Sequence, residues 1–208
     1  MNVRYMIASS DEAKNKLDEN PDATLIAKFD VFNFYEINTT NKYVEVLKYE
    51  PYKIKTDDWY ESILPWFNYD DPDKAFIIWD QGEDEIKNFK DINADEVTNL
   101  DKHIIYTDGE VLSENIENEK ITFKTMAIGV PHIIKVSYFP NWKVEGGYGP
   151  YVISPSFMMV IPTQSDVTLY YASTKVDIIS RTITQITWVF LLALLFYDIS
   201  KFMAKRKR

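Results

Sequence analysis

Residues 182–197 read TITQITWVFLLALLFY, an uncharged stretch that separates a long preceding region from a short C-terminal tail. Continued through Asp198 to Met203, it reaches about 20 residues, enough for an α-helix to cross the hydrocarbon core of a bilayer. Asp198 lies near one end, where a carboxylate can reach the interface at modest cost. We therefore expect a transmembrane helix over 180–203. A buried helix of a soluble protein is the alternative, but it would leave the basic residues that follow unexplained.

The last eight residues carry five cations and no acid: Lys201, Lys205, Arg206, Lys207 and Arg208. Positive residues that flank a membrane span favour the cytoplasmic side, so these five predict a cytoplasmic tail at 204–208 and an extracytoplasmic region before the helix. The first ten residues lack the basic and apolar regions of a signal peptide. We therefore expect upstream membrane spans of the same parent protein to translocate the outer region. A tail-anchored protein with a cytoplasmic domain is the rival, but it would export the basic tail.

The overall charge limits the partners of the outer region. The chain has 23 Lys and Arg against 32 Asp and Glu, a formal net charge of -9. Because this balance repels a phosphate backbone, we expect no nucleic-acid partner. The sequence has no cysteine, which excludes disulfides and thiolate sites.

The sequence before the helix predicts an α+β region at 1–118. A strand at 3–8 is followed by a helix from 11 to about 19 and by a hairpin of strands 23–29 and 32–38. Further on we expect two strands, at 43–49 and 75–79, and a helix that opens at 57–59 and runs toward Phe67. Residues 80–118 are acidic and irregular, so we interpret them as surface connections with one strand at 103–106.

Dense short strands follow over 119–176. They are expected at 121–125, 133–138, 142–145, 151–154, 157–161 and 167–171, with turns rich in Gly, Pro and Asn between them. This spacing is typical of an antiparallel β-sandwich. The predicted fold class is thus α+β: a small mixed α/β unit, then a β-sandwich, then one C-terminal transmembrane helix.

Three segments of the sandwich region carry a family resemblance: IIKVSYFPNWKVEG at 133–146, GPYVISPSFMMVIP at 149–162 and VTLYY at 167–171. Together they resemble the last extracytoplasmic β-domain of archaeal polytopic membrane proteins labelled "6-pyruvoyl-tetrahydropterin synthase-related". These proteins are similar in plan to bacterial YfhO-type proteins and other GT-C-fold glycosyltransferases. The opening NVRYM at 2–6 also resembles the strand at which their C-terminal outer region starts.

The resemblance implies a parent enzyme that transfers a sugar from a polyprenyl-linked donor outside the cell membrane. In GT-C enzymes the catalytic carboxylate lies in an early loop near the first membrane spans, so the resemblance assigns no catalytic residue, metal or cofactor to this chain. It implies a non-catalytic extracytoplasmic portion that contacts glycan or acceptor. An independent membrane-anchored binding module at the cell surface is the alternative, and a hydrolase that uses acidic clusters is a third hypothesis.

Trp142, Tyr148 and Tyr151 surround the glycine-rich turn and are the candidate ligand-binding residues, because exposed aromatic rings stack on the apolar faces of sugars. The competing interpretation places Trp142 in the sandwich core, since strand alternation already explains it. His103 and His132 have no acid nearby at metal spacing and predict packing roles. The carboxylates at 57–58, 70–73 and 83–85 lack the order of a calcium loop and predict solvated loops.

Asn38 begins an Asn-Thr-Thr triplet, a possible N-glycosylation site at the end of a strand. Such a modification would require an extracytoplasmic position.

Overall fold

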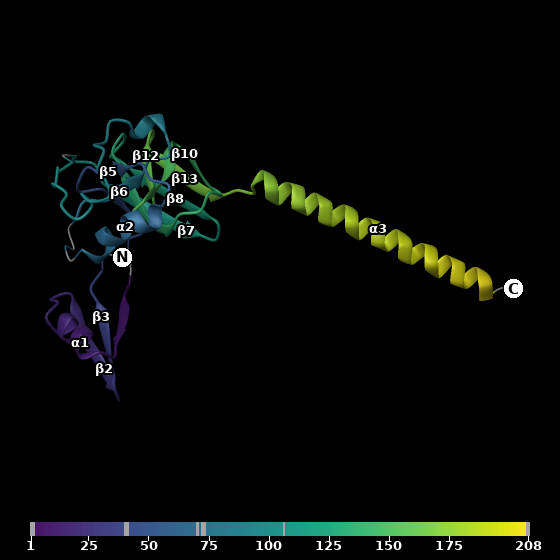
Figure 1. The fold of residues 1–208 in the computed structure, drawn as a ribbon, viewed down its shortest axis with the longest axis horizontal. Coiled ribbons are helices and arrows are strands. Elements are labelled where there is room, and N and C mark those ends of the chain that lie inside the picture. Colours follow the sequence, from purple (N-terminus) through teal and green to yellow (C-terminus); the bar gives the residue numbers. More distant parts are fainter. Residues whose placement is uncertain (1–2, 40–41, 70, 72–73, 106, 207–208) are drawn as a thin grey trace. The chain divides into compact units, whose positions relative to one another are not determined.

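We describe a computed structural model of the chain, which covers residues 3–39, 42–69, 71, 74–105 and 107–206, with only the backbone described from 198 onward. Two compact units divide at Tyr171: one contains the sheets, and the other contains the C-terminal helix. Figure 1 shows the elements of both. The α+β class and the C-terminal apolar helix predicted from the sequence are confirmed.

The N-terminal elements form a small sheet covered by one helix. The sheet is antiparallel with strand order β1-β3-β2, where β1 is Tyr5–Ala8, β2 is Ala23–Phe29 and β3 is Phe32–Ile37. Helix α1 (Asp11–Asp18) is capped by Ser10, whose hydroxyl accepts a hydrogen bond from the Ala13 amide at 3.3 Å. Its Leu17 packs on Ala8 and Tyr35, so α1 buries one face of the sheet. These elements match the expected ones closely.

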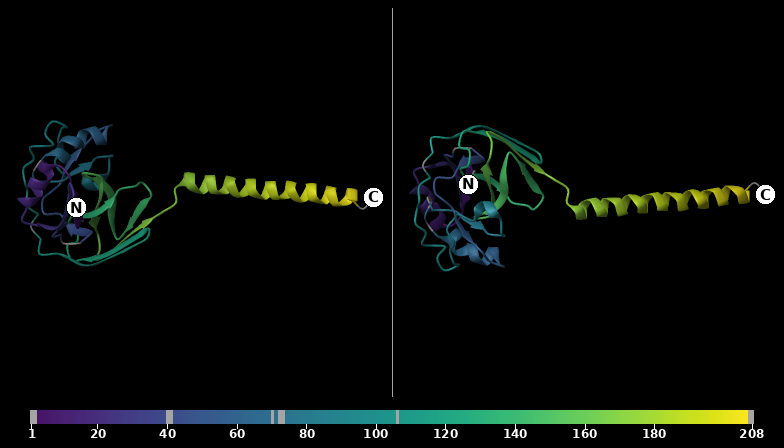
Figure 2. Two further views of the ribbon diagram at one scale, coloured as in Figure 1. Left: turned by 90° about the horizontal axis from the view of Figure 1, so that it is seen from below. Right: turned by 90° about the horizontal axis from the view of Figure 1, so that it is seen from above.

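Two larger sheets make the β-sandwich (Figures 1 and 2). The six-stranded sheet has the order β4-β9-β12-β11-β6-β5, with strands Val44–Val46, His132–Ser137, Phe157–Pro162, Gly147–Ile153, Ile77–Trp79 and Tyr52–Ile54. The four-stranded sheet has the order β10-β13-β8-β7, with strands Trp142–Glu145, Asp166–Tyr171, Lys120–Thr125 and Val111–Glu117. All pairs with a defined register are antiparallel except β5 with β6, which is parallel.

The expected boundary at residue 118 does not separate the sheets. Strands β4, β5 and β6 come from the region predicted as a separate α+β unit, yet they complete the six-stranded sheet. Strand β7 completes the four-stranded sheet, although its sequence lies within the stretch interpreted as irregular. The sandwich therefore needs residues from both expected regions, because the strands at 119–176 alone leave these edges unpaired.

The six-stranded sheet is buried on both faces. Met158 and Val160 face the four-stranded sheet in the sandwich core, whereas Met159 lies between them and faces the opposite way. The second face is covered by the segment that follows β6, including the 3-10 helix η1 (Asp84–Ile86), which buries Ile86 completely. Burial on both faces explains why β12 reads as a continuous apolar run.

Lys53 fixes part of the covering segment to β5. Its amide donates to the carbonyl of Lys90 at 2.9 Å, and its carbonyl accepts from the amide of Ile92 at 3.0 Å. Its ammonium group, which is almost fully buried, lies 2.5 Å from the Asp91 carboxylate and 3.7 Å from that of Asp80. Since a buried charge requires partners, this contact explains how an irregular segment stays in place.

Helix α2 (Trp59–Asn68) begins at the predicted position. Asp58 caps it by accepting a hydrogen bond from the Glu61 amide at 3.1 Å. Pro65 lies inside the helix rather than ending it. Ile63 and Trp66 pack against β5 and β6 in a separate apolar cluster.

Helix α3 (Lys175–Arg206) is one unbroken helix, and its stretch Lys175–Tyr197 is long and apolar enough to cross a membrane (Figure 1). This stretch has 23 residues, and an 18-residue window within it has a mean hydropathy of 1.7. At 1.5 Å per residue it extends about 34 Å, against about 30 Å for a hydrocarbon core.

Three threonines of α3 are compatible with lipid. The hydroxyls of Thr182, Thr184 and Thr187 donate to carbonyls four residues back, at 2.8, 2.8 and 2.9 Å. Because these donors find partners within the helix, their cost in hydrocarbon is small. The side chains of Lys201, Lys205 and Arg206 lie outside the described part, as do Lys207 and Arg208 entirely.

Candidate functional site

A bulge in β11 determines where the candidate tyrosines point. Tyr148 pairs with Ile161 and Tyr151 pairs with Met159, so three steps along β11 match two steps along β12. In a regular strand, residues three apart point to opposite faces, and the extra residue of a bulge reverses this. Tyr148 and Tyr151 therefore share one face of the six-stranded sheet.

Two glycines allow the chain to take this path. Gly149 has φ +109°, and a Cβ there would lie 2.8 Å from the carbonyl oxygen of Met159. Gly146 has φ +85°, and a Cβ there would lie 2.4 Å from the carbonyl oxygen of Asp166. Both positions need glycine, because a Cβ would be disfavoured by the positive φ and would also clash with the neighbouring carbonyl oxygen. The stretch interpreted as a turn is thus largely part of strand β11.

A groove of about 360 Å³ opens beside the bulge. Residues of β10 and β11 line one wall of the groove, and the residue before η1 together with η1 itself contributes the other. The lining residues are Val144, Gly147, Tyr148, Gly149, Pro150, Tyr151, Glu83 and Glu85. The Tyr148 side chain is 48% exposed and stands at the rim. This volume is near the lower end for small-molecule sites.

Tyr151 forms the inner end of the groove. Its hydroxyl donates a hydrogen bond to Glu85 Oε2 at 3.2 Å. Burial, together with the neighbouring Glu85 carboxylate, raises the pKa of the Tyr151 phenol. Burial and the Glu83 carboxylate likewise raise the pKa of Tyr138. The phenols therefore stay protonated as donors, and the two carboxylates supply acceptor oxygens at the groove.

Trp142 does not line the groove. Its side chain is only 9% exposed and packs in the sandwich core with residues of β8, β12 and β13. The structure therefore brings together two of the three candidate aromatic residues and places the third in the core. Glu83 and Glu85 were missed as site residues, because only the tertiary fold brings the loop at 83–85 beside β11.

The remaining polar candidates have structural contacts. His132 is fully buried, with Nδ1 2.8 Å from the Val130 carbonyl oxygen and Nε2 2.8 Å from Thr125 Oγ1. His103 lies beside Tyr52, with ring centroids 6.4 Å apart. Among the residues that the structure describes, no group of three or more His, Asp or Glu could hold a metal ion.

The acidic clusters also have individual roles. Asp58 caps α2, Asp71 lies 2.8 Å from the Lys102 ammonium, and Asp84 pairs with Lys87. Asp70 and Asp73 fall outside the described residues. Asn38 is exposed just after β3, as a glycosylated residue must be, whereas Thr40 of its triplet is not described.

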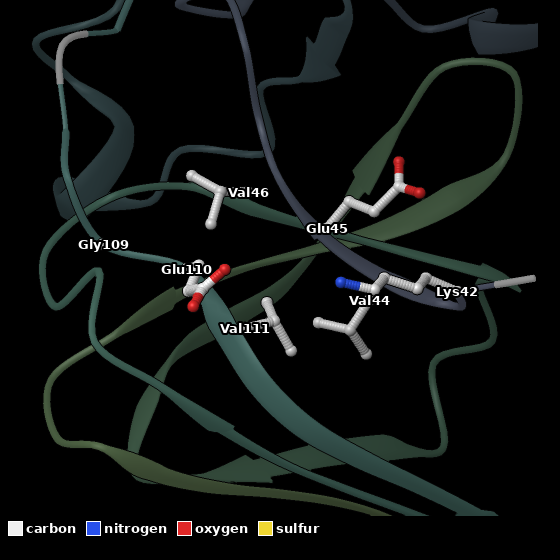
Figure 3. Close-up of a pocket in the computed structure, with 7 residues that line it drawn as sticks. All are labelled: Lys42, Val44, Glu45, Val46, Gly109, Glu110 and Val111. Atoms are coloured by element: carbon white, nitrogen blue, oxygen red, sulfur yellow. The ribbon is translucent and has the colours of Figure 1, made fainter. Parts of the chain in front are cut away.

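A second hollow lies between the edge strand β4 and the start of β7 (Figure 3). It has about 190 Å³ and an apolar floor of Val44, Val46 and Val111. Beside it, the Glu114 carboxylate accepts the amides of Tyr43 and Val44, at 2.9 and 2.7 Å. We interpret this hollow as the seam where the two sheets meet, because its edge donors are already bonded to the partner sheet.

Comparisons of the chain with protein-family models, with curated proteins and with solved structures give no match.

Proposed function

We propose that this chain is a non-catalytic, membrane-anchored outer region that binds glycan in the Tyr148 groove. The observation that carries the proposal is the β11 bulge, which sets Tyr148 and Tyr151 on the same face beside Glu83 and Glu85. Apolar C–H faces of a sugar ring stack on an exposed aromatic side chain. Carboxylate oxygens accept hydrogen bonds from sugar hydroxyls. The groove offers both types of contact within one small volume.

The charge of the groove favours neutral or amino-bearing sugars. Within the described part of the chain, its charged lining residues are Glu83 and Glu85, and no Lys or Arg lines it. A phosphate or uronate would meet two like charges without a compensating cation. The bound group is therefore a neutral glycan or acceptor sugar rather than the phosphate of a polyprenyl-linked donor.

The wider setting is the resemblance to GT-C glycosyltransferases. In that setting the chain is the last outer region of a membrane glycosyltransferase, with catalysis supplied by upstream parts of the same parent protein. Helix α3, as its last span, would hold the sandwich at the outer surface of the cell membrane with the C-terminus in the cytoplasm. Under the alternative hypothesis of an independent surface-binding module, the groove binds glycan in the same way, but the chain is not part of a larger glycosyltransferase.

Binding is tested with the full chain in a mild detergent against a panel of neutral, amino and acidic oligosaccharides. Saturation-transfer NMR should show contact with neutral or amino sugars, and Tyr148→Ala should weaken binding at least tenfold. Tyr60→Ala is the matched control, because Tyr60 is 68% exposed on α2 and does not line the groove. Equal binding by the Tyr148 variant and the wild type would refute glycan binding in this groove.

The parent protein is tested separately from the coding sequence upstream. An in-frame series of hydrophobic segments supports the glycosyltransferase setting. A stop codon followed by a promoter favours the independent module.

A further inference from the structure

The N-terminal sheet has an open face that is apolar. The β-pairing puts Tyr5, Ile7, Phe34 and Phe32 on the face opposite α1, and Phe29 joins them across from Phe32. Ile7 is 63% exposed and Phe29 is 75% exposed. Figure 1 shows α1 against the other face. A contiguous patch of this kind, unlike scattered apolar residues, indicates a partner.

The hairpin tip continues this face. Asp30 adopts φ +52° in the two-residue turn between β2 and β3, which presents Phe29, Val31 and Phe32 together at one end of the sheet. Asp30 carries the only charge among these four residues. Aromatic and aliphatic side chains at a hairpin tip are suited to entering an apolar phase.

Charge is segregated across this small unit. On the open face, Glu36 bonds to Arg4 at 2.9 Å, so the pair is neutral. The opposite side carries the acidic and basic residues of α1, with Asp11 and Glu12 in its first turn and Lys16 in its last. One neutral apolar face and one charged face are the arrangement of an element that lies in a membrane interface.

The size of the face argues against a second copy of the chain as its cover. Three strands about 4.8 Å apart and about 20 Å long give a footprint of about 300 Å². A stable dimer buries about 800 Å² on each partner. A small apolar face is sufficient only where the partner is already held close to it.

Helix α3 supplies that proximity. Only residues 172–174 separate the end of β13 from the start of α3. A chain anchored by α3 is held beside a bilayer at high effective concentration, so a few apolar side chains are enough for contact. We propose that the open face of the β1-β3-β2 sheet, led by Phe29, Val31 and Phe32, rests in the interface of the lipid bilayer. The proposal requires α3 to be in the membrane, and it is independent of glycan binding.

The absence of cysteine from the sequence makes a direct test possible. Val31→Cys in the full chain, labelled with an environment-sensitive fluorophore, is reconstituted in phosphatidylcholine vesicles with or without brominated acyl chains. Asn15→Cys is the control on the exposed side of α1. We expect brominated lipid to quench the label at 31 at least threefold more than the label at 15, and aqueous iodide to show the reverse order.

Further variants separate the possible outcomes. The double variant Phe29→Ser, Phe32→Ser should make the label at position 31 accessible to quenching by iodide. Both phenylalanines are exposed, so the sheet keeps its core in this variant. A label at Leu194→Cys reports whether α3 is in lipid, which distinguishes failure of the anchor from failure of the sheet contact. With α3 in lipid, equal iodide access at 31 and 15 overturns the proposal. Protection of position 31 from both quenchers also overturns it, because protein would then cover the face.

Discussion

At the scale of single residues, two tryptophans differ in one hydrogen bond. Trp66 Nε1 donates to the buried carbonyl of Ala75 at 2.7 Å, whereas the buried Trp59 Nε1 has no hydrogen-bond partner among the residues that the structure describes. Trp59 stacks on Trp79 instead, with ring centroids 5.9 Å apart. An unmade hydrogen bond in the interior costs free energy, so these similar residues contribute differently to stability.

We expect Trp66→Phe to lower the free energy of unfolding by about 1–3 kcal/mol, because it leaves the Ala75 carbonyl without its donor. Trp59→Phe should lower the free energy of unfolding by at least about 1 kcal/mol less than Trp66→Phe does, since it removes an N–H group that makes no hydrogen bond to the described residues. Both changes remove similar volume, so each controls for the other. Pulse proteolysis in urea on the detergent-solubilised chain measures both, and equal losses would contradict the assignment.

His132 makes the stability of the sandwich core depend on pH. Nδ1–H donates to the Val130 carbonyl, and Nε2 lies 2.8 Å from Thr125 Oγ1, an arrangement that fits the neutral ring. Burial lowers the pKa of the imidazole in the folded state. As the pH falls below about 6.5, the unfolded chain takes up a proton that the folded chain does not. Stability contributed by His132 is therefore complete above that pH and is lost as the pH falls toward the lower folded-state pKa.

We expect the free energy of unfolding to fall by up to about 1.4 kcal/mol per pH unit as the pH is lowered below 6.5. Unfolding free energies of the wild type between pH 7.5 and 5.5 should show it. His132→Gln should remove this slope whatever its effect at pH 7.5, and His103→Gln, at an exposed position, should keep it. An unchanged slope in the His132 variant would show that another group is responsible.

At the scale of elements, the bulge of β11 depends on Gly149. Gly82 is a matched control, because it also has a positive φ, +99°, but nothing lies within 4 Å of where its Cβ would be. Gly82→Ala should cost about 1 kcal/mol from backbone conformation alone. Gly149→Ala adds the clash with the Met159 carbonyl, so we expect a loss of about 2–4 kcal/mol. Urea unfolding compares the two, and equal losses would mean that the strand shifts without strain.

The elements also show how far the sequence predicts the fold. β12, with FMMVIP, and helix α1, with its Ser10 cap, follow from local pattern and agree with expectation. β7 was missed because VLSENIE is an exposed edge strand whose polar residues resemble a loop. β5 has three residues and is fixed by its parallel pairing with β6 and by the hydrogen bonds of Lys53 to the segment at 90–92. Short or exposed strands owe their conformation to partners that a local pattern does not contain.

The candidate site was predictable only in part. The sequence names Trp142, Tyr148 and Tyr151 together as candidate ligand-binding residues, and only the two tyrosines line the groove. The core position of Trp142 agrees with the competing interpretation from strand alternation. The shared orientation of the two tyrosines depends on the bulge, which a pattern of alternating residues does not reveal. Glu85 reaches Tyr151 across 66 positions of sequence, so that contact required the tertiary structure.

At the scale of the whole molecule, the helix and its flanking charges predict an orientation. Five cations follow the apolar stretch, and no acid lies among the last eight residues. Positive residues are retained on the cytoplasmic side, so the sheets should lie outside and the tail inside. The proposed glycan binding outside the cell and the predicted glycosylation of Asn38 both depend on this orientation.

Single cysteines test the orientation in intact cells that express the chain together with the coding sequence upstream of it, because the outer region is expected to need upstream spans for translocation. Glu117→Cys, at the exposed end of β7, should react with a membrane-impermeant maleimide. Lys205→Cys should react only after the membrane is permeabilised, because four of the five cations remain to hold the tail inside. Replacing all five cations with Gln should make the orientation mixed, with labelling of both positions in intact cells. Labelling of the tail alone in cells that keep the cations would reverse the topology and place the groove in the cytoplasm.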